Sequence, residues 1–147
     1  MADLRLHVDT GAVTYHIYDA DGEEISKVKF TPTDTGIMER YKEVVKALDG
    51  IQFDEEAATE DQIVALDKKI SNQFDYLLGR PVSAGLFAVV KPLTVLENGD
   101  WFFESVFERL GDVITEAYEK RYKAKLDKIE KATKEYQEEE APASDPS

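Results

Sequence analysis

The segment that decides the fold is residues 13–30, which reads VTYHIYDADGEEISKVKF. Apolar and polar side chains alternate over residues 13–18 and again over residues 25–30, a pattern typical of β-strands with one buried face. Between them, Asp21-Gly22 favours the positive φ angles of a two-residue type I′ turn. A turn centred there joins the two strands as an antiparallel hairpin.

This turn also sets the strand register and, with it, the buried face. The expected cross-strand pairs are Tyr15 with Val28, Val13 with Phe30, and Ile17 with Ser26. One face of the hairpin then becomes almost wholly apolar. Residues 4–8 alternate in the same way and precede Thr10-Gly11. We therefore expect a three-stranded meander in which Leu6 and Val8 join the apolar face.

The middle of the chain has helical spacing and would cover that face. A first helix, capped by Thr33 or Asp34, carries its apolar residues on one stripe, Ile37, Tyr41, Val44 and Leu48, and ends at Asp49-Gly50. Residues 51–58 read as a connecting loop. A capping box over residues 59–62 starts a second helix that runs to Gly79. Residues 83–90 lie between two prolines and predict a short, buried turn of helix.

A long terminal helix is expected after Asn98 or Asp100, either of which can cap it. Its apolar stripe is wide as far as Tyr118. Beyond that point it narrows to Tyr122, Leu126, Ile129 and Tyr136, so this half should project from the domain. Residues 138–147 have almost nothing to bury and predict a disordered acidic tail. The expected architecture is a single α+β domain over residues 1–137, with a small N-terminal antiparallel three-stranded meander packed against a helical bundle.

The composition narrows the classes of function. The 147 residues carry 31 acids and 18 bases, a net charge of −13 that disfavours nonspecific nucleic-acid binding. The basic stretch at residues 120–125 is diluted by nearby acids and reads as a solvated helix face. No cysteine is present, which excludes thiolate metal sites and thiol nucleophiles. The longest wholly apolar run, residues 86–90, is too short to span a membrane, and the first three residues do not begin a signal peptide.

Residues suited to catalysis are sparse and scattered. The two histidines, His7 and His16, become diagonal neighbours on the polar face of the meander, but no third ligand has a suitable spacing for a metal site. No serine lies in a Gly-x-Ser-x-Gly elbow, and no glycine pattern matches a nucleotide-binding loop. Adjacent acids arise by chance in so acidic a chain. We therefore assign no catalytic, cofactor-binding or metal-binding residue and expect a protein that is not an enzyme.

The strongest local feature is the aromatic cluster at the start of the terminal helix. We expect the aromatic residues of this cluster, Trp101, Phe102, Phe103 and Phe107, to pack in the core. Part of the apolar stripe of the helix can also stay exposed as a docking surface. The candidate partner-binding residues are Trp101, Phe102, Phe107 and Tyr118. Of these, Phe102 and Phe107 are the expected exposed anchors, because they flank a buried centre formed by Phe103, Val106, Leu110, Val113 and Ala117.

The order of these elements resembles a known family. The hairpin is followed by Phe30-Thr31-Pro32-Thr33-Asp34, then by a helix with an Ile-x-x-Arg start, by residues 70–79, and by Trp101-Phe102-Phe103-Glu104 at the opening of the terminal helix. Over residues 13–137 this pattern resembles the small tail assembly chaperones of long-tailed bacteriophages that infect Gram-positive hosts. The lengthened, charged terminal helix and the acidic tail depart from that family.

The resemblance implies a non-enzymatic function in the cytoplasm of a bacterial host. Members of that family are thought to bind the long helical tape measure protein during tail assembly, without a cofactor, and they supply no active-site residues to carry over. It implies a protein partner rather than a nucleic acid or a membrane, and leaves self-association open. The alternative from another class is an acidic inhibitor or counter-defence protein that mimics nucleic acid with carboxylates spaced along helices.

Overall fold

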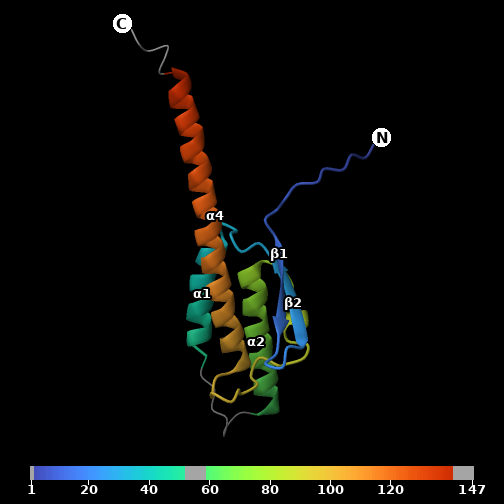
Figure 1. Ribbon diagram of the computed structural model, residues 1–147. Coiled ribbons are helices and arrows are strands. Elements are labelled where there is room, and N and C mark those ends of the chain that lie inside the picture. Colours follow the sequence, from blue (N-terminus) through green and yellow to red (C-terminus); the bar gives the residue numbers. More distant parts are fainter. Residues whose placement is uncertain (1, 52–58, 141–147) are drawn as a thin grey trace.

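The computed structural model describes residues 2–51 and 59–140 and shows an α+β fold. In chain order its elements are β1 (Val13–Tyr18), β2 (Glu24–Phe30), α1 (Ile37–Asp49), α2 (Glu60–Leu78), α3 (Ser83–Leu86) and α4 (Phe102–Glu140). The β1–β2 hairpin, α1, α2 and the first half of α4 form one body, and the second half of α4 extends away from it (Figure 1). The expected α+β class and the long C-terminal helix are confirmed.

One hydrophobic core joins the hairpin to the helices. Its buried side chains come from every element except β1: Val28, Phe30, Ile37, Val44, Ile70, Phe74, Leu77, Leu78, Leu86, Phe87, Phe103, Val106, Leu110 and Ile114. Phe74 on α2 is at the centre of this core, because the rings of Phe87 and Phe107 both meet it edge-on. Burial of these apolar surfaces is the main favourable term that holds the sheet and the helices together.

The register of the hairpin is confirmed. Tyr15 lies opposite Val28, Val13 opposite Phe30, and Ile17 opposite Ser26. The two-residue turn is wrong, because a bulge after Ile17 shifts the pairing and leaves a longer loop. The Asp19 carboxylate accepts hydrogen bonds from the backbone N–H groups of Asp21 and Glu23, both 2.9 Å long, and within this loop Gly22 takes a positive φ of 85°. These hydrogen bonds to the Asp19 side chain therefore stabilise the longer loop instead of the two-residue turn.

The expected third strand is wrong: the sheet has two strands, and residues 4–8 form no strand in the described part of the chain. Leu4, Leu6 and Val8 are exposed instead of joining the apolar face. Just after this segment, the carbonyl oxygens of Thr10 and Gly11 accept hydrogen bonds from Oγ1 of Thr31 and Nη1 of Arg121 rather than from a neighbouring strand. Alternation alone gives a segment β propensity, but a strand forms only where an edge accepts it.

Helices α1 and α2 form an antiparallel pair in which only α2 has the expected cap. The capping box of α2 is confirmed, since Thr59 and Gln62 exchange side-chain and backbone hydrogen bonds, and Gly79 ends the helix in the left-handed region. The Thr33 or Asp34 cap of α1 is wrong, because the N-cap is Gly36. Asp34 instead pairs with Arg40 on the first turn of α1, with 2.8 Å between Oδ2 and Nη2.

The segment between the two prolines contains the expected short helix, although only part of it is buried. Helix α3 is a single turn, Leu86 and Phe87 enter the core, and Val89 is exposed. Helix α4 then begins at Phe102, later than Asn98 or Asp100, because the N–H groups of Phe102 and Phe103 donate to backbone carbonyls in the preceding loop. Main-chain acceptors thus replace the expected side-chain cap.

Halfway along α4, one arginine joins the helix to the start of the chain. Nη1 of Arg121 donates to the Gly11 carbonyl oxygen at 2.9 Å and to Oγ1 of Thr33 at 3.0 Å. The basic stretch of residues 120–125 is therefore not wholly a solvated face. Beyond it the helix continues to Glu140, three residues past the expected domain boundary, and the rest of the predicted disordered tail, residues 141–147, lies outside the described residues.

Candidate functional site

An open apolar groove of about 640 Å³ lies between the hairpin and the first half of α4. Its apolar lining comes from both strands, the loop before α4, and α4 itself: Tyr15, Ile17, Ile25, Val28, Val90, Leu96, Phe102, Val106, Leu110 and Val113. We call this feature the hairpin–helix groove. It exists because the side chains of β1 that face α4 are only partly covered by it.

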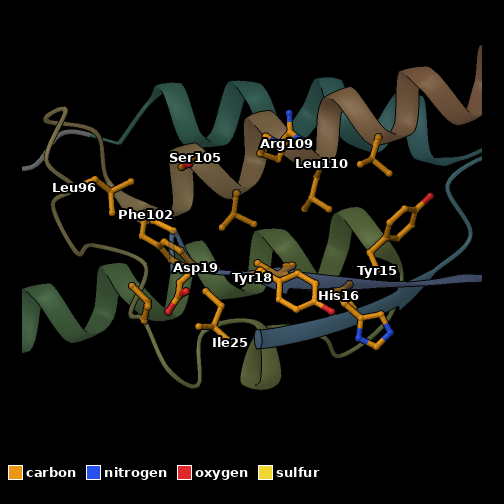
Figure 2. Close-up of a pocket in the computed structure, with 16 residues that line it drawn as sticks. Tyr15, His16, Tyr18, Asp19, Ile25, Leu96, Phe102, Ser105, Arg109 and Leu110 are labelled. Atoms are coloured by element: carbon orange, nitrogen blue, oxygen red, sulfur yellow. The ribbon is translucent and has the colours of Figure 1, made fainter. Parts of the chain in front are cut away.

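The close-up in Figure 2 shows how the walls of the groove face each other. Leu110 points from α4 toward the hairpin, and Tyr18 and Ile25 lie on the opposite wall. Arg109 stands at the rim, where it pairs with exposed Asp112. Burial raises the pKa of the Tyr15 phenol, so this ring is neutral at physiological pH. An apolar floor with a thin polar rim suits apolar side chains of a ligand or partner.

Of the four candidate partner-binding residues, Phe102 alone lines this groove. Its ring is partly buried and meets Phe87 edge-on, with 6.1 Å between ring centroids. Its neighbour Trp101 turns to another side and stacks on Phe103 at 5.6 Å. At the start of α4, the ring of Phe102 therefore lies toward the groove, whereas the ring of Trp101 packs against Phe103 of the same helix.

The expectation of an exposed anchor is wrong for Phe102, whose side chain is partly buried, and it is also wrong for Phe107. Its ring is partly buried and stacks on Tyr41 of α1, with 4.8 Å between centroids and 9° between planes. Tyr118 also contacts another part of the fold, since its hydroxyl donates a hydrogen bond to the Asp34 carbonyl oxygen at 3.1 Å. The four candidates therefore do not form one surface, because Phe107 and Tyr118 face α1 and the loop before it.

The residues that complete the groove could not be found from sequence. Tyr18, Leu96 and Val90 line it although they belong to no apolar stripe of a helix and lie far apart in the chain. The alternation of β1 did place Tyr15 and Ile17 on the inner face. Which part of that face α4 leaves open depends on how the helix packs, and no local pattern encodes that packing.

The two histidines do not come together. The third strand that would have placed His7 beside His16 is absent from the described residues, and Nδ1 of His16 instead contacts the Glu24 carboxylate on the neighbouring strand. Within residues 2–51 and 59–140, no group of three or more potential ligands is arranged to hold a metal ion.

One carboxyl group of α2 lies in an unfavourable environment. Burial raises the pKa of Asp67 above its ordinary value of 3.8, although the Leu93 N–H and the charge of Lys91 act in the opposite direction. Oδ1 of Asp67 is buried and has no hydrogen-bond partner. An ionised carboxylate with an unpaired oxygen destabilises the folded state.

We expect Asp67→Asn to raise the free energy of unfolding at pH 7 by about 1 kcal/mol. Because the folded-state pKa is the higher one, the folded protein binds more protons, and the wild type loses stability as pH rises through the window above 3.8. Urea denaturation at pH 4 and pH 7 measures this difference. Asp67→Asn should make the difference in the free energy of unfolding between pH 4 and pH 7 smaller than in the wild type.

Asp34 serves as the control, because its pKa is shifted in the opposite direction to that of Asp67. The hydrogen bond from Arg40 lowers the pKa of Asp34, so this pair stabilises the protein above the ordinary carboxyl pKa and loses its effect as pH falls. Asp34→Asn should therefore lower stability at pH 7. If both variants changed stability in the same direction, the assignment of Asp67 as a destabilising charge would be incorrect.

Comparison with known proteins adds no relative, since no protein-family model, curated protein or solved structure matches this chain. None of the helices in the described part of the chain is long and apolar enough to cross a lipid bilayer.

Proposed function

We propose that this protein is a non-enzymatic tail assembly chaperone of a long-tailed bacteriophage that binds an apolar segment of the tape measure protein. The observation that supports the proposal is the hairpin–helix groove, whose two walls present apolar side chains to solvent. A helical partner with an apolar stripe can lay that stripe into such a groove. The proposed site of action is the cytoplasm of the bacterial host.

The charge of the chain suits the same role. A net charge of −13 keeps a complex with an apolar partner soluble, while the groove supplies the contact area. Binding through the groove needs no covalent chemistry and no cofactor. Since the interaction is apolar at its centre, its affinity should depend only weakly on salt.

The test is co-expression with the tape measure protein encoded by the same phage, followed by measurement of the dissociation constant of the purified pair. Phe102→Ala and Tyr18→Ala should each weaken binding by about 5- to 150-fold, the range for loss of an aromatic anchor. Tyr18 is 60% exposed, so its replacement removes a groove contact with little effect on the fold.

The matched control is Tyr122→Ala, which removes an equally exposed aromatic ring of α4 outside the groove. It should leave binding of the tape measure protein unchanged. Phe107→Ala is expected to lower stability rather than affinity, because Phe107 packs on Tyr41. Loss of binding with Tyr122→Ala and normal binding with Tyr18→Ala would place the contact elsewhere.

The second candidate function, an acidic mimic of nucleic acid, is favoured by the charge of −13 alone. It makes the opposite prediction about salt. Affinity for a basic partner would fall steeply between low and moderate salt and would not respond to Phe102→Ala or Tyr18→Ala. That result would replace the chaperone proposal.

A further inference from the structure

The outer edge of strand β1 is open to an added strand. The described sheet has two strands, so β1 pairs with β2 on one side only. In an antiparallel pair, every second residue directs its N–H and C=O groups away from the partner strand. In the described part of the chain, no group outside the hairpin is hydrogen-bonded to the main chain of residues 13–18. These main-chain groups are therefore free to pair with another extended segment.

This free edge of β1 borders the hairpin–helix groove. The groove touches the consecutive residues 15–20, although neighbouring side chains of a strand lie on opposite faces. A hollow that touches both faces of β1 borders the strand along its edge. In Figure 2, Tyr15, His16 and Tyr18 follow one another along this wall, across from Leu110 of α4. A segment that enters the groove therefore comes next to the free main-chain groups of β1.

The open space follows the full length of β1. A second hollow, of about 420 Å³, lies beside the groove and shares Tyr15 and Val113 with it. Its lining begins at Val13 on β1 and reaches Ala124 on α4. The six residues of β1 span about 20 Å at about 3.3 Å per residue. The two hollows together thus accompany β1 from its first residue to its last.

An extended segment matches both parts of this site. Its apolar side chains, at alternate positions, can contact Val106, Leu110 and Val113 of α4, while its main chain continues the sheet beside β1. The main-chain groups of a helix are already paired within the helix, so a bound helix would leave the edge of β1 without partners. The site therefore favours an extended segment over a helical one.

The charges on the outer face of the hairpin favour particular side chains in that segment. The side chains between its apolar residues would lie on the outer face, beside His16 and near Lys27 and Lys29. Both lysines are exposed, and neither forms an ion pair within the described residues. The carboxylate on this face, that of Glu24, already contacts His16. Acidic side chains at the intervening positions are therefore complementary to this face.

The N-terminal segment of the chain itself, residues 4–8, has the apolar alternation but not these charges. Its three apolar side chains are between 78% and 89% exposed, and it forms no strand on β1 in the described structure. Arg5 and His7 separate the apolar residues and would lie beside the basic side chains of the outer face. Bases next to one another weaken strand pairing. Apolar alternation is therefore not sufficient for this edge, and acidic residues are needed between the apolar ones.

We propose that the free edge of β1 binds an extended partner segment with apolar residues at alternate positions and acidic residues between them. The partner segment adds to the sheet beside β1 and places its apolar side chains in the hairpin–helix groove. This inference rests on the proposed function, because it specifies which kind of tape measure segment the groove takes.

Synthetic peptides test the conformation of the bound segment. The probe is a fluorescently labelled peptide of about ten residues, longer than β1, in which leucine and glutamate alternate. The control is an isomer of the same composition with its leucines at helical spacing. In titrations of the full chain, the dissociation constant of the alternating peptide should be at least about tenfold lower, because only this peptide can also pair with β1. Equal or tighter binding of the isomer, or no binding of the alternating peptide up to about 1 mM, would overturn the proposal.

N-methylation of the alternating peptide tests the main-chain pairing. Methyl groups on every second residue remove either the N–H groups that face β1 or those that face away from it. One of the two methylated peptides should therefore bind at least about tenfold more weakly, and the other should stay within about threefold of the unmodified peptide. Equal losses with both peptides, or no loss with either, would contradict strand addition.

A charge reversal on the hairpin tests the preference for acidic residues. Lys27→Glu combined with Lys29→Glu should weaken binding of the leucine–glutamate peptide about fivefold or more, and should favour a leucine–arginine peptide instead. The matched control is Lys131→Glu combined with Lys134→Glu, which changes the net charge equally on exposed residues of α4 outside the two hollows. Equal effects of the two double variants would contradict a local charge preference.

These assays separate the inference from the proposed function, because none of them uses the tape measure protein. Tighter binding of the helical isomer would overturn the inference and leave the proposed function intact. Failed capture of the tape measure protein, together with the expected peptide binding, would instead reject the proposed function and support the site at β1.

Discussion

Val28→Asp is expected to lower the free energy of unfolding by about 4 kcal/mol or more, a large share of the stability of a domain of this size. Val28 is 1% exposed and faces the core from β2. An aspartate there must either bury an unpaired charge or take up a proton, and both cost free energy. Urea denaturation at pH 7, followed by circular dichroism, measures the loss.

Lys27→Asp is the matched control for this substitution. Lys27 precedes Val28 on the same strand, faces outward and lies opposite His16. The same aspartate at this position should change stability by no more than about 1 kcal/mol. Equal losses in the two variants would mean that the inner face of the hairpin is not the buried one.

Phe74→Ala is expected to cost about 3–5 kcal/mol. Phe74 is fully buried, and its ring meets those of Phe87 and Phe107 edge-on, at 5.2 Å and 6.2 Å between centroids. Removing the ring therefore leaves a cavity at the point where α2, α4 and the segment after α3 meet. The shift of the urea midpoint at constant slope gives this cost.

The control on the same helix is Val64→Ala, because Val64 is 60% exposed. Its replacement should stay within about 0.5 kcal/mol of the wild type. A small effect of Phe74→Ala, similar to that of Val64→Ala, would show that the core relaxes around the missing ring or that α2 packs by another face.

The features that could be predicted from the sequence are those set by neighbouring residues. The register of β1 and β2 follows from alternation around one turn, and a bulge near the loop leaves the pairs further along unchanged. The capping box at Thr59 and the glycine at the end of α2 are also local signals. Each of these depends on contacts within a few residues or across one hairpin.

The predictions that were wrong concern features that depend on residues far away in the sequence. Residues 4–8 alternate like a strand, but the carbonyl of Gly11 is bound by Arg121, which is 110 residues away in sequence. The local sequence predicts side-chain caps at Thr33 or Asp34 and at Asn98 or Asp100. Asp34 is instead paired with Arg40, and backbone carbonyls in the loop before α4 accept the first N–H groups of that helix.

The candidate site was predictable only in part for the same reason. Phe102 could be named because an aromatic cluster at a helix start is visible in the sequence. Phe107 has the same local signal, yet Tyr41 of α1 covers it. The stripe on α4 is apolar on several sides, and only the arrangement of the hairpin and α1 around it determines which side remains open.

The contribution of α4 to the core has a consequence for the order of folding. Phe103, Leu110 and Ile114 reach the core only after the hairpin and α2 have been synthesised. The 71 residues between Phe30 and Phe102 take about 4–14 s to translate at about 5–20 residues per second. During that interval the inner face of the nascent hairpin has no α4 to cover it. Burial of this face is therefore completed only when the C-terminal helix docks.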